Sequence, residues 1–154
     1  MTFESTRRVP KPHHNFVPEY QMSGIPFVKS VTCRSVADAA DLKANISDYK
    51  LEFPTVTRWI KLHNHDDVQK TNVKIYFSET AASEAFDVGG DSHYYLLDIE
   101  EVTERLELKC KHIYIVPTET GKTPLVSIIA GLTSVPAADF PDQTKENGFS
   151  GIED

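Results

Sequence analysis

The chain has 154 residues, of which 40% are hydrophobic, and its formal net charge is −7. This length fits one domain, and this apolar content can build a core without disulfides or structural metals. An acidic chain without a basic stripe binds nucleic acid poorly, so we expect no nucleic-acid partner. The longest apolar run, Pro124 to Leu132, is shorter than the ~18 residues that a membrane span needs.

The sequence shows neither a leader pattern nor a disulfide framework. Residues 1–16 contain no apolar core of the kind that a secretory signal has, so secretion by the usual route is not expected. The two cysteines, Cys33 and Cys110, both fall in predicted strands. We expect them to be buried free thiols, which fits a reducing compartment.

Short apolar stretches separated by Pro, Gly, Asn and Asp run through the middle of the chain, which is typical of an all-β domain. The clearest is Asn72 to Phe77, where Val73, Ile75 and Phe77 alternate with more polar residues and predict a half-buried strand. The predicted strands are 26–33, 48–53, 56–63, 72–77, 92–99, 103–109, 112–116 and 124–132. Short helical turns fit 36–43 and the middle of the connection 79–91.

Strand pairing can be predicted at one place. The polar segment Asn64 to Lys70 is too short for a helical crossover, so we expect 56–63 and 72–77 to pair antiparallel as a hairpin. Residues 103–109 and 112–116 have no turn between them and form either two strands or one bent strand. About eight such strands predict a single antiparallel β-sandwich that is jelly-roll-like, although an immunoglobulin-like order fits nearly as well.

The two ends of the chain differ from its middle. Residues 1–25 include Pro10, Pro12 and Pro18 and show no helical period, which predicts an extended N-terminal arm. Residues 134–154 hold few apolar residues and predict a C-terminal tail, so the sandwich domain spans 26–133. We expect both ends to contact neighbouring protein subunits. The predicted partner-contact residues are Arg7, Arg8, Phe16, Tyr20, Phe140 and Phe149.

Two segments offer metal ligands, but their context favours another interpretation. His63, His65, Asp66 and Asp67 carry suitable side chains, yet they lie at the predicted hairpin tip, where such residues are common in solvated turns. Asp87 to Asp91 is acidic and glycine-rich, but it lacks the ligand spacing of an EF-hand calcium loop. We therefore predict no metal site and no cofactor.

Catalytic groups are not indicated either. The carboxylates of Asp98, Glu100, Glu101 and Glu104 fall at a strand end and the following turn, where solvation is expected rather than paired acid–base work. Neither cysteine has a nucleophile motif around it. The sequence therefore predicts that the chain is not an enzyme.

The aromatic residues allow an alternative function. Trp59, Tyr76, Tyr94, Tyr95 and Tyr114 could line a sheet face that binds sugars. Aromatic residues are also the ordinary core and cross-strand pairs of a β-sandwich. A glycan- or ligand-binding module therefore remains the alternative to a structural subunit.

Several stretches resemble small β-sandwich virion proteins of large icosahedral double-stranded DNA viruses. They are Val17 to Val28, Phe53 to Asn64 (FPTVTRWIKLHN), Val73 to Glu79 (VKIYFSE), Tyr94 to Leu97 (YYLL) and Leu106 to Ile115 (LELKCKHIYI). The resemblance implies a minor capsid, cement or vertex protein that is located in the virion and links capsomers through its arm and tail. Its implied partners are other capsid proteins, and it implies no catalytic, cofactor or metal residue.

Overall fold

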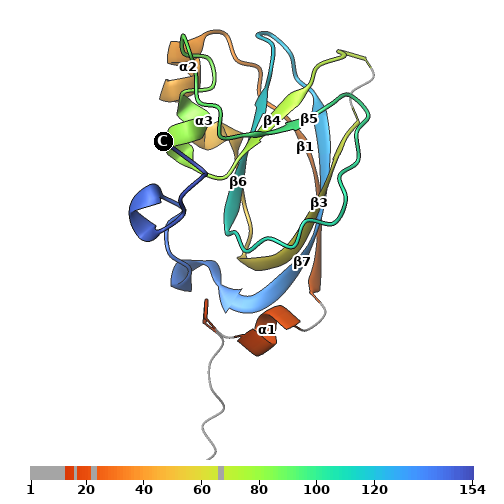
Figure 1. Ribbon diagram of the computed structural model, residues 1–154. Coiled ribbons are helices and arrows are strands. Elements are labelled where there is room, and N and C mark those ends of the chain that lie inside the picture. The colour runs from red at the N-terminus through yellow and green to blue at the C-terminus, as the bar shows by residue number, and fades with distance from the viewer. Residues whose placement is uncertain (1–12, 16, 22–23, 66–67) are drawn as a thin grey trace, which may run out of the picture.

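The computed structural model describes residues 13–15, 17–21, 24–65 and 68–154. The prediction of an all-β sandwich is confirmed, because two antiparallel sheets face each other with few helices around them (Figure 1). The first sheet has the order β1 (Ile25–Thr32), β7 (Leu125–Pro136), β3 (Thr55–Asn64). The second sheet has the order β2 (Lys50–Glu52), β6 (His112–Pro117), β4 (Val73–Tyr76), β5 (Tyr95–Leu97).

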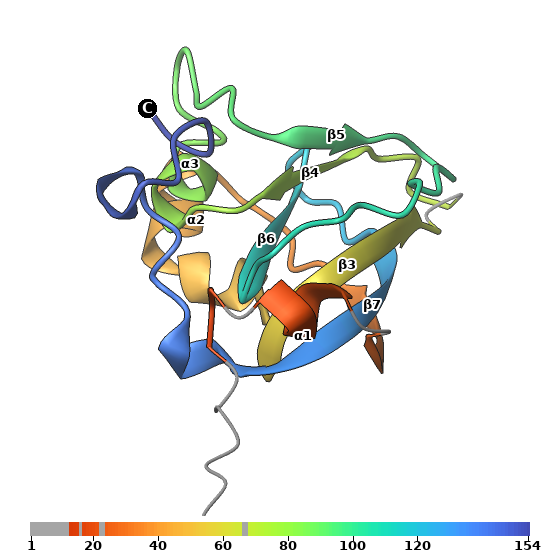
Figure 2. The ribbon, with the colours of Figure 1, turned by 60° about the horizontal axis from the view of Figure 1, so that its bottom comes forward.

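The main core lies between the two sheets, which form separate layers in Figure 2. Successive side chains of a strand point to opposite faces, so alternate residues of β7 enter this core. Val126, Ile128 and Ala130 are buried there, opposite Ile75 of β4 and Ile113 of β6. The long apolar run of β7 suits its central place, since β7 pairs with β1 on one side and with β3 on the other.

The second sheet is buried on its other side as well. Helices α2 (Ala39–Ala44) and α3 (Glu79–Ser83) and the 3-10 helix η1 (Ile46–Tyr49) contribute to a second apolar cluster there. Tyr76 of β4 and Tyr114 of β6 lie in this cluster and are almost fully buried. The sequence predicted a half-buried strand with Tyr76 on its polar side, which is wrong because the short helices cover that side.

The predicted hairpin is also wrong, since β3 and β4 belong to different sheets. Residues 65–72 instead carry the chain from one layer to the other, and an extended segment of this length spans roughly 25 Å, which exceeds the ~10 Å between packed sheets. The buried Asn64 side-chain amide donates to the Thr71 carbonyl over 3.0 Å and ties the two ends of this connection together. Lys70 adopts a positive φ of 51° within it.

Residues 103–109 do not form the predicted strand. They follow the free edge of β3 and touch it at isolated bridges, where Leu106 pairs with Ile60 and Val102 with His63. The Leu108 amide donates to the Leu106 carbonyl two residues earlier, over 3.0 Å, so the backbone bonds to itself and a continuous ladder cannot form. The segment nevertheless covers one edge of the first sheet.

The N-terminal arm departs from the extended conformation that was predicted. Val17–Gln21 form a short helix, α1, at one end of the sandwich (Figure 1). Pro18 lies in its first turn, where proline's missing N–H removes no intrahelical bond, so this proline does not prevent the helix. The other two prolines of the arm, Pro10 and Pro12, lie outside the described residues.

The C-terminal residues pack on their own sandwich. Strand β7 continues to Pro136, beyond the predicted boundary at 133, and residues 137–154, called the tail below, include the 3-10 helices η2 (Ala137–Asp139) and η3 (Lys145–Asn147). Gln143 is buried and its side chain bonds to four backbone groups of the second sheet and its neighbours. The Glu153 carboxylate accepts from the Ser78 hydroxyl and from the Lys145 amide.

Both cysteines are buried free thiols, as predicted. Burial raises the pKa of the Cys110 thiol to about 12, although the Thr57 hydroxyl beside it lowers that pKa slightly. The thiol of Cys110 is therefore protonated at neutral pH and unreactive. None of the helices in the described part of the chain has the length and apolar character that crossing a membrane requires.

Candidate functional site

The side of the first sheet that points away from the core carries several apolar side chains. We call it the outer face and define it by Pro26, Val28, Trp59, Leu125 and Ile129. Val28 and Ile129 are directly paired across β1 and β7, and their exposed fractions are 71% and 42%. No helix of the described residues covers this pair in the way that α2 and α3 cover the second sheet.

Trp59 gives the outer face a flat region. Its indole lies across Gly131, the residue opposite it on β7, and a Cβ added to Gly131 would lie 2.2 Å from the indole Nε1. Only glycine allows the ring to approach the strand this closely. The guanidinium of Arg105 lies 6.0 Å from the centre of the same ring, at the outer range of a cation–π contact.

Polar side chains border the outer face. The Ser30 and Ser127 hydroxyls are 2.7 Å apart, and the His65 Nε2 atom is 2.7 Å from the same Ser127 oxygen. The His63 and His65 rings lie side by side with their centres 3.7 Å apart. Burial, followed by the neighbouring His65, lowers the pKa of His63. The two aspartates that follow, Asp66 and Asp67, lie outside the described residues, so the solvated turn expected for this group stays a prediction.

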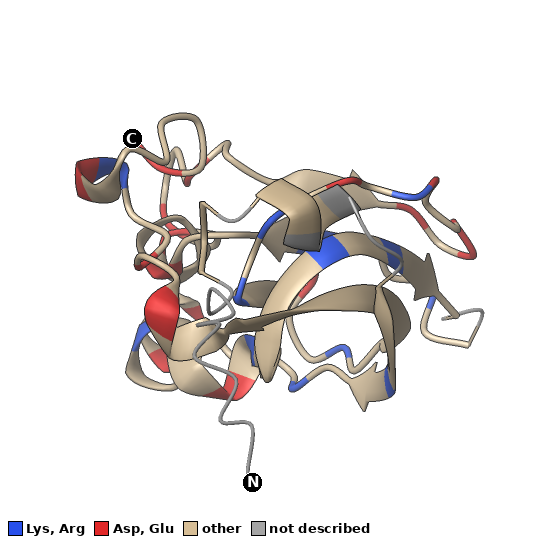
Figure 3. Cartoon of the chain, turned by 90° about the horizontal axis from the view of Figure 1, so that it is seen from below, with Lys and Arg blue, Asp and Glu red and all other residues tan. Residues whose placement is uncertain are grey.

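The first sheet differs in charge from the rest of the molecule. Its three strands contain Lys29, Arg58 and Lys61 and no acidic residue, whereas the whole chain has a net charge of −7. Figure 3 shows acidic residues on the side that carries the C-terminus and also on the loops at the opposite edge. Lys61 lies beside Ile129 in the register, so the apolar centre of the outer face has a basic border.

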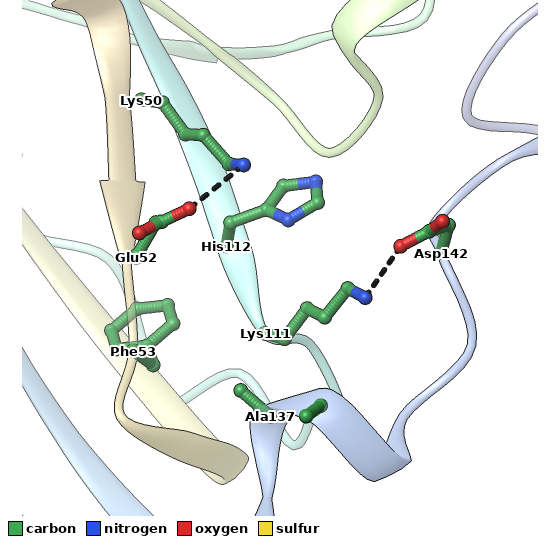
Figure 4. Close-up of a pocket in the computed structure, with 8 residues that line it drawn as sticks. Lys50, Glu52, Phe53, Lys111, His112, Ala137 and Asp142 are labelled. Atoms are coloured by element: carbon green, nitrogen blue, oxygen red, sulfur yellow. Dashed lines mark hydrogen bonds and ion pairs between the residues drawn. The ribbon is translucent and has the colours of Figure 1, made fainter. Parts of the chain in front are cut away.

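A second candidate is a small charged cleft beside the tail (Figure 4). It has a volume of about 250 Å³. Its ammonium groups are both paired, Lys50 Nζ with Glu52 at 2.9 Å and Lys111 Nζ with Asp142 at 2.6 Å. His112 lies between these pairs and is 8% exposed.

The chemistry of this cleft is limited. Burial, assisted by the positive charges of Lys50 and Lys111, lowers the pKa of His112 to about 4, so its imidazole is neutral at pH 7. A neutral imidazole can accept a proton, but none of the residues that line the cleft is a serine, threonine or cysteine that it could activate. The cleft therefore holds a neutral imidazole between two ion pairs.

The predicted partner-contact residues lie elsewhere. Tyr20 and Phe149 pack against an intramolecular cluster of Val56, Val135 and Phe140, and Phe140 is only 6% exposed. The Arg58 Nε–H donates to the Tyr20 carbonyl over 2.6 Å, which fastens α1 to β3. These aromatic residues thus join the two ends of the chain to the sandwich, and the prediction that they contact a partner stays untested.

Arg7, Arg8 and Phe16 lie outside the described residues. The sequence analysis did not predict the outer face, because it assigned the partner contacts to the two ends of the chain. The available signal was the stretch 125–136, which contains no charged residue. An apolar strand that long must either be covered on both sides or leave one side apolar and exposed.

The acidic turn and the aromatic set can also be placed. The Glu101 carboxylate accepts from the Asp98 amide over 2.7 Å, and Asp98 is exposed, as predicted for a solvated turn. Among the aromatic residues considered for sugar binding, Tyr76 and Tyr114 are buried, while Tyr94 and Tyr95 remain partly exposed beside a hollow of about 370 Å³. The aromatic residues therefore do not form one continuous platform.

Comparisons with protein-family models, with curated proteins and with solved structures each found no match. The likeness to virion proteins therefore rests on the sequence stretches alone.

Proposed function

We propose that the chain is a structural subunit of a viral capsid, a minor capsid, cement or vertex protein that binds a neighbouring capsid protein through its outer face. The observation that carries this proposal is the exposed apolar pair of Val28 and Ile129, on a sheet without acidic residues. Contiguous apolar surface of this kind is typical of protein-binding sites.

The fold supports a contact of this type. The outer face lies on the back of a two-layer sandwich whose inner face is packed into the main core, so the sheet is rigid before binding. Its apolar centre gains from burial, and its basic border, which includes Lys61, favours a partner surface with acidic residues around an apolar patch. We therefore expect the neighbour to be a different capsid protein with that pattern.

The outer face is a different contact surface from the one that the sequence-based hypothesis assigned. That hypothesis assigned the contacts to the arm and the tail, but the tail packs on its own sandwich through Gln143 and Phe140. The contacts expected from residues 1–12 remain a prediction. The outer face adds a contact surface that is independent of both ends.

The test is incorporation into particles. In virions assembled with tagged copies of the chain, Val28→Glu and Ile129→Glu should each reduce the amount of the chain per particle about tenfold or more, because each would bury a carboxylate in the contact. The matched control is Val88→Glu, since Val88 is fully exposed on a distant loop and should leave incorporation unchanged.

Thermal unfolding of the purified variants separates folding from binding. Both outer-face variants should melt within a few degrees of the parent chain, because exposed substitutions usually change stability by only about 0.5 kcal/mol. Absence of the parent chain from purified particles would exclude the capsid role. Normal incorporation of the two outer-face variants would exclude the outer face as the contact.

A further inference from the structure

Side chains from two segments that are far apart in the sequence meet at the end of the loop 84–91. Asp91 and His93 come from the start of the segment that leads to β5, and Asp154 comes from the docked tail. One ligand atom from each of them lies within 4.8 Å of the other two. The sequence analysis considered residues 87–91 as a loop, and nothing in the sequence indicates that Asp154 lies beside that loop.

The distances fit a small divalent cation. The His93 Nδ1 atom is 3.1 Å from Asp91 Oδ1 and 3.4 Å from Asp154 Oδ1. Zinc bonds to histidine nitrogen and carboxylate oxygen are about 2.0–2.2 Å long, so neighbouring ligands in a tetrahedral site stand roughly 3.3–3.5 Å apart. The two observed separations therefore need only small adjustments.

The Asp91 side chain gives an independent indication of a ligand. It is 0% exposed, and its Oδ2 atom has no hydrogen-bond partner. Its Oδ1 atom accepts from the His93 amide over 2.6 Å, so one oxygen is held in place while the other remains without a donor. A buried carboxylate with an unsatisfied oxygen is costly unless a cation or donor compensates it.

We propose that Asp91, His93 and Asp154 form a binding site for a divalent transition-metal ion, with Zn²⁺ as the best-fitting cation. The His93 Nδ1 atom supplies the nitrogen ligand, and the two carboxylates supply oxygen. Mixed nitrogen and oxygen ligands favour Zn²⁺ over Ca²⁺ and Mg²⁺, which prefer oxygen alone. Asp154 is 80% exposed and His93 borders the hollow beside Tyr94, so solvent can complete the coordination.

Such an ion would connect two separate segments of the fold. The tail already reaches this place through Glu153, which bonds to Ser78 and to the Lys145 amide. A metal ion held by Asp154 on one side and by Asp91 and His93 on the other would cross-link the tail to the loop before β5. The site would therefore slow release of the tail as well as bind metal.

The experiment titrates Zn²⁺ into the chelator-treated full chain by calorimetry. The double variant His63→Ala, His65→Ala serves as the parent, because those adjacent imidazoles offer a competing zinc contact. We expect one Zn²⁺ bound per parent chain, and about tenfold or greater weakening by Asp154→Asn and by His93→Ala. Asp98→Asn, which alters an exposed acid on the following turn, should leave zinc affinity unchanged.

Asp154→Asn is the decisive variant, because Asp154 is exposed and its substitution should leave the fold intact, whereas Asp91→Asn alters a buried group. Limited proteolysis gives a second measurement: Zn²⁺ should slow cleavage of the tail in the parent but not in Asp154→Asn. The proposal is overturned if the parent binds no stoichiometric Zn²⁺, or if Asp154→Asn and His93→Ala bind it as tightly as the parent does. In either case the hydrogen bond between His93 Nδ1 and Asp91 Oδ1 accounts for the cluster.

Discussion

The contact between Trp59 and Gly131 shows how closely one residue constrains another in the first sheet. Gly131→Ala would place a methyl group against the indole, and Gly24 approaches the same strand from the other side. Because the ring and the backbone must separate, we expect a loss of about 1–3 kcal/mol in the free energy of unfolding. Trp59 is the chain's only tryptophan, so its fluorescence should change in the folded state of the variant.

Gly89→Ala is the control for this prediction. Gly89, unlike Gly131, has a positive φ, of 82°, and nothing lies within 4 Å of an added Cβ. This substitution should cost about 1 kcal/mol through backbone strain and leave the tryptophan emission unchanged. Equal stability of Gly131→Ala and the parent chain would show that the indole can move aside without cost.

The lowered pKa of His112 predicts how the stability of the folded chain depends on pH. Its pKa is lowered from 6.5 to about 4 in the folded chain, so the unfolded chain takes up a proton first as the pH falls. The contribution of its neutral form is complete above pH 6.5 and is lost between pH 6.5 and 4. We expect this one residue to lower the free energy of unfolding by about 2–3 kcal/mol between pH 7 and pH 4.5.

Urea unfolding at pH 7 and pH 4.5 tests this contribution. The variant His112→Gln cannot be protonated, so it should lose about 2 kcal/mol less than the parent over this interval. Lysine partners lower the pKa values of nearby Glu52 and Asp142, so the stability that these two carboxylates contribute is also lost in acid. The parent and His112→Gln share this loss. An identical loss in both proteins would contradict the assigned role of His112.

At the scale of elements, one buried amide makes several of the hydrogen bonds that fasten the tail to the sandwich. The Gln143 Oε1 atom accepts from the Lys111 amide over 2.7 Å, and its Nε2 donates to the carbonyls of Phe77 and His112. Gln143→Ala leaves these backbone groups unsatisfied, and we expect a loss of about 2–3 kcal/mol. Hydrogen exchange of residues 137–154 should accelerate more than exchange in β7.

Asn147→Ala provides the comparison for Gln143. The Asn147 side chain donates to the Asp142 carbonyl inside the tail and is exposed. Loss of this hydrogen bond should change amide hydrogen exchange near η3 but leave the tail docked on the sandwich. If Gln143→Ala behaved like Asn147→Ala, the tail would be held by its apolar contacts at Phe140 rather than by the amide.

The elements that could be predicted from the sequence are those whose signal is local. Short apolar stretches bounded by turn residues located β1 to β7, with period-two alternation clearest in β4, and the alanine-rich stretch located α2. Which strands pair is not local information. The length of 65–72 allows either a hairpin or a change of sheet, and the choice depends on β7, more than 50 residues later, which provides the longer apolar partner.

At the scale of the whole molecule, the candidate sites were less predictable than the fold. Predicting the outer face required knowing that none of the described helices covers the exposed side of β7. The group of Asp91, His93 and Asp154 required knowing that the tail returns to the loop before β5. Both depend on contacts between distant segments, and the irregular tail has no periodic pattern from which its position could be inferred.

The order of the first sheet has a consequence for how the chain folds during synthesis. Strand β1, at residues 25–32, forms hydrogen bonds only with β7, at residues 125–136, among the strands described. Until residues 125–136 have been synthesised, β1 and β3 have no central strand to bind, and their apolar side chains stay uncovered. The first sheet can therefore close only after about 100 further residues have followed β1, so the nascent chain depends on slow, long-range pairing and on protection from aggregation.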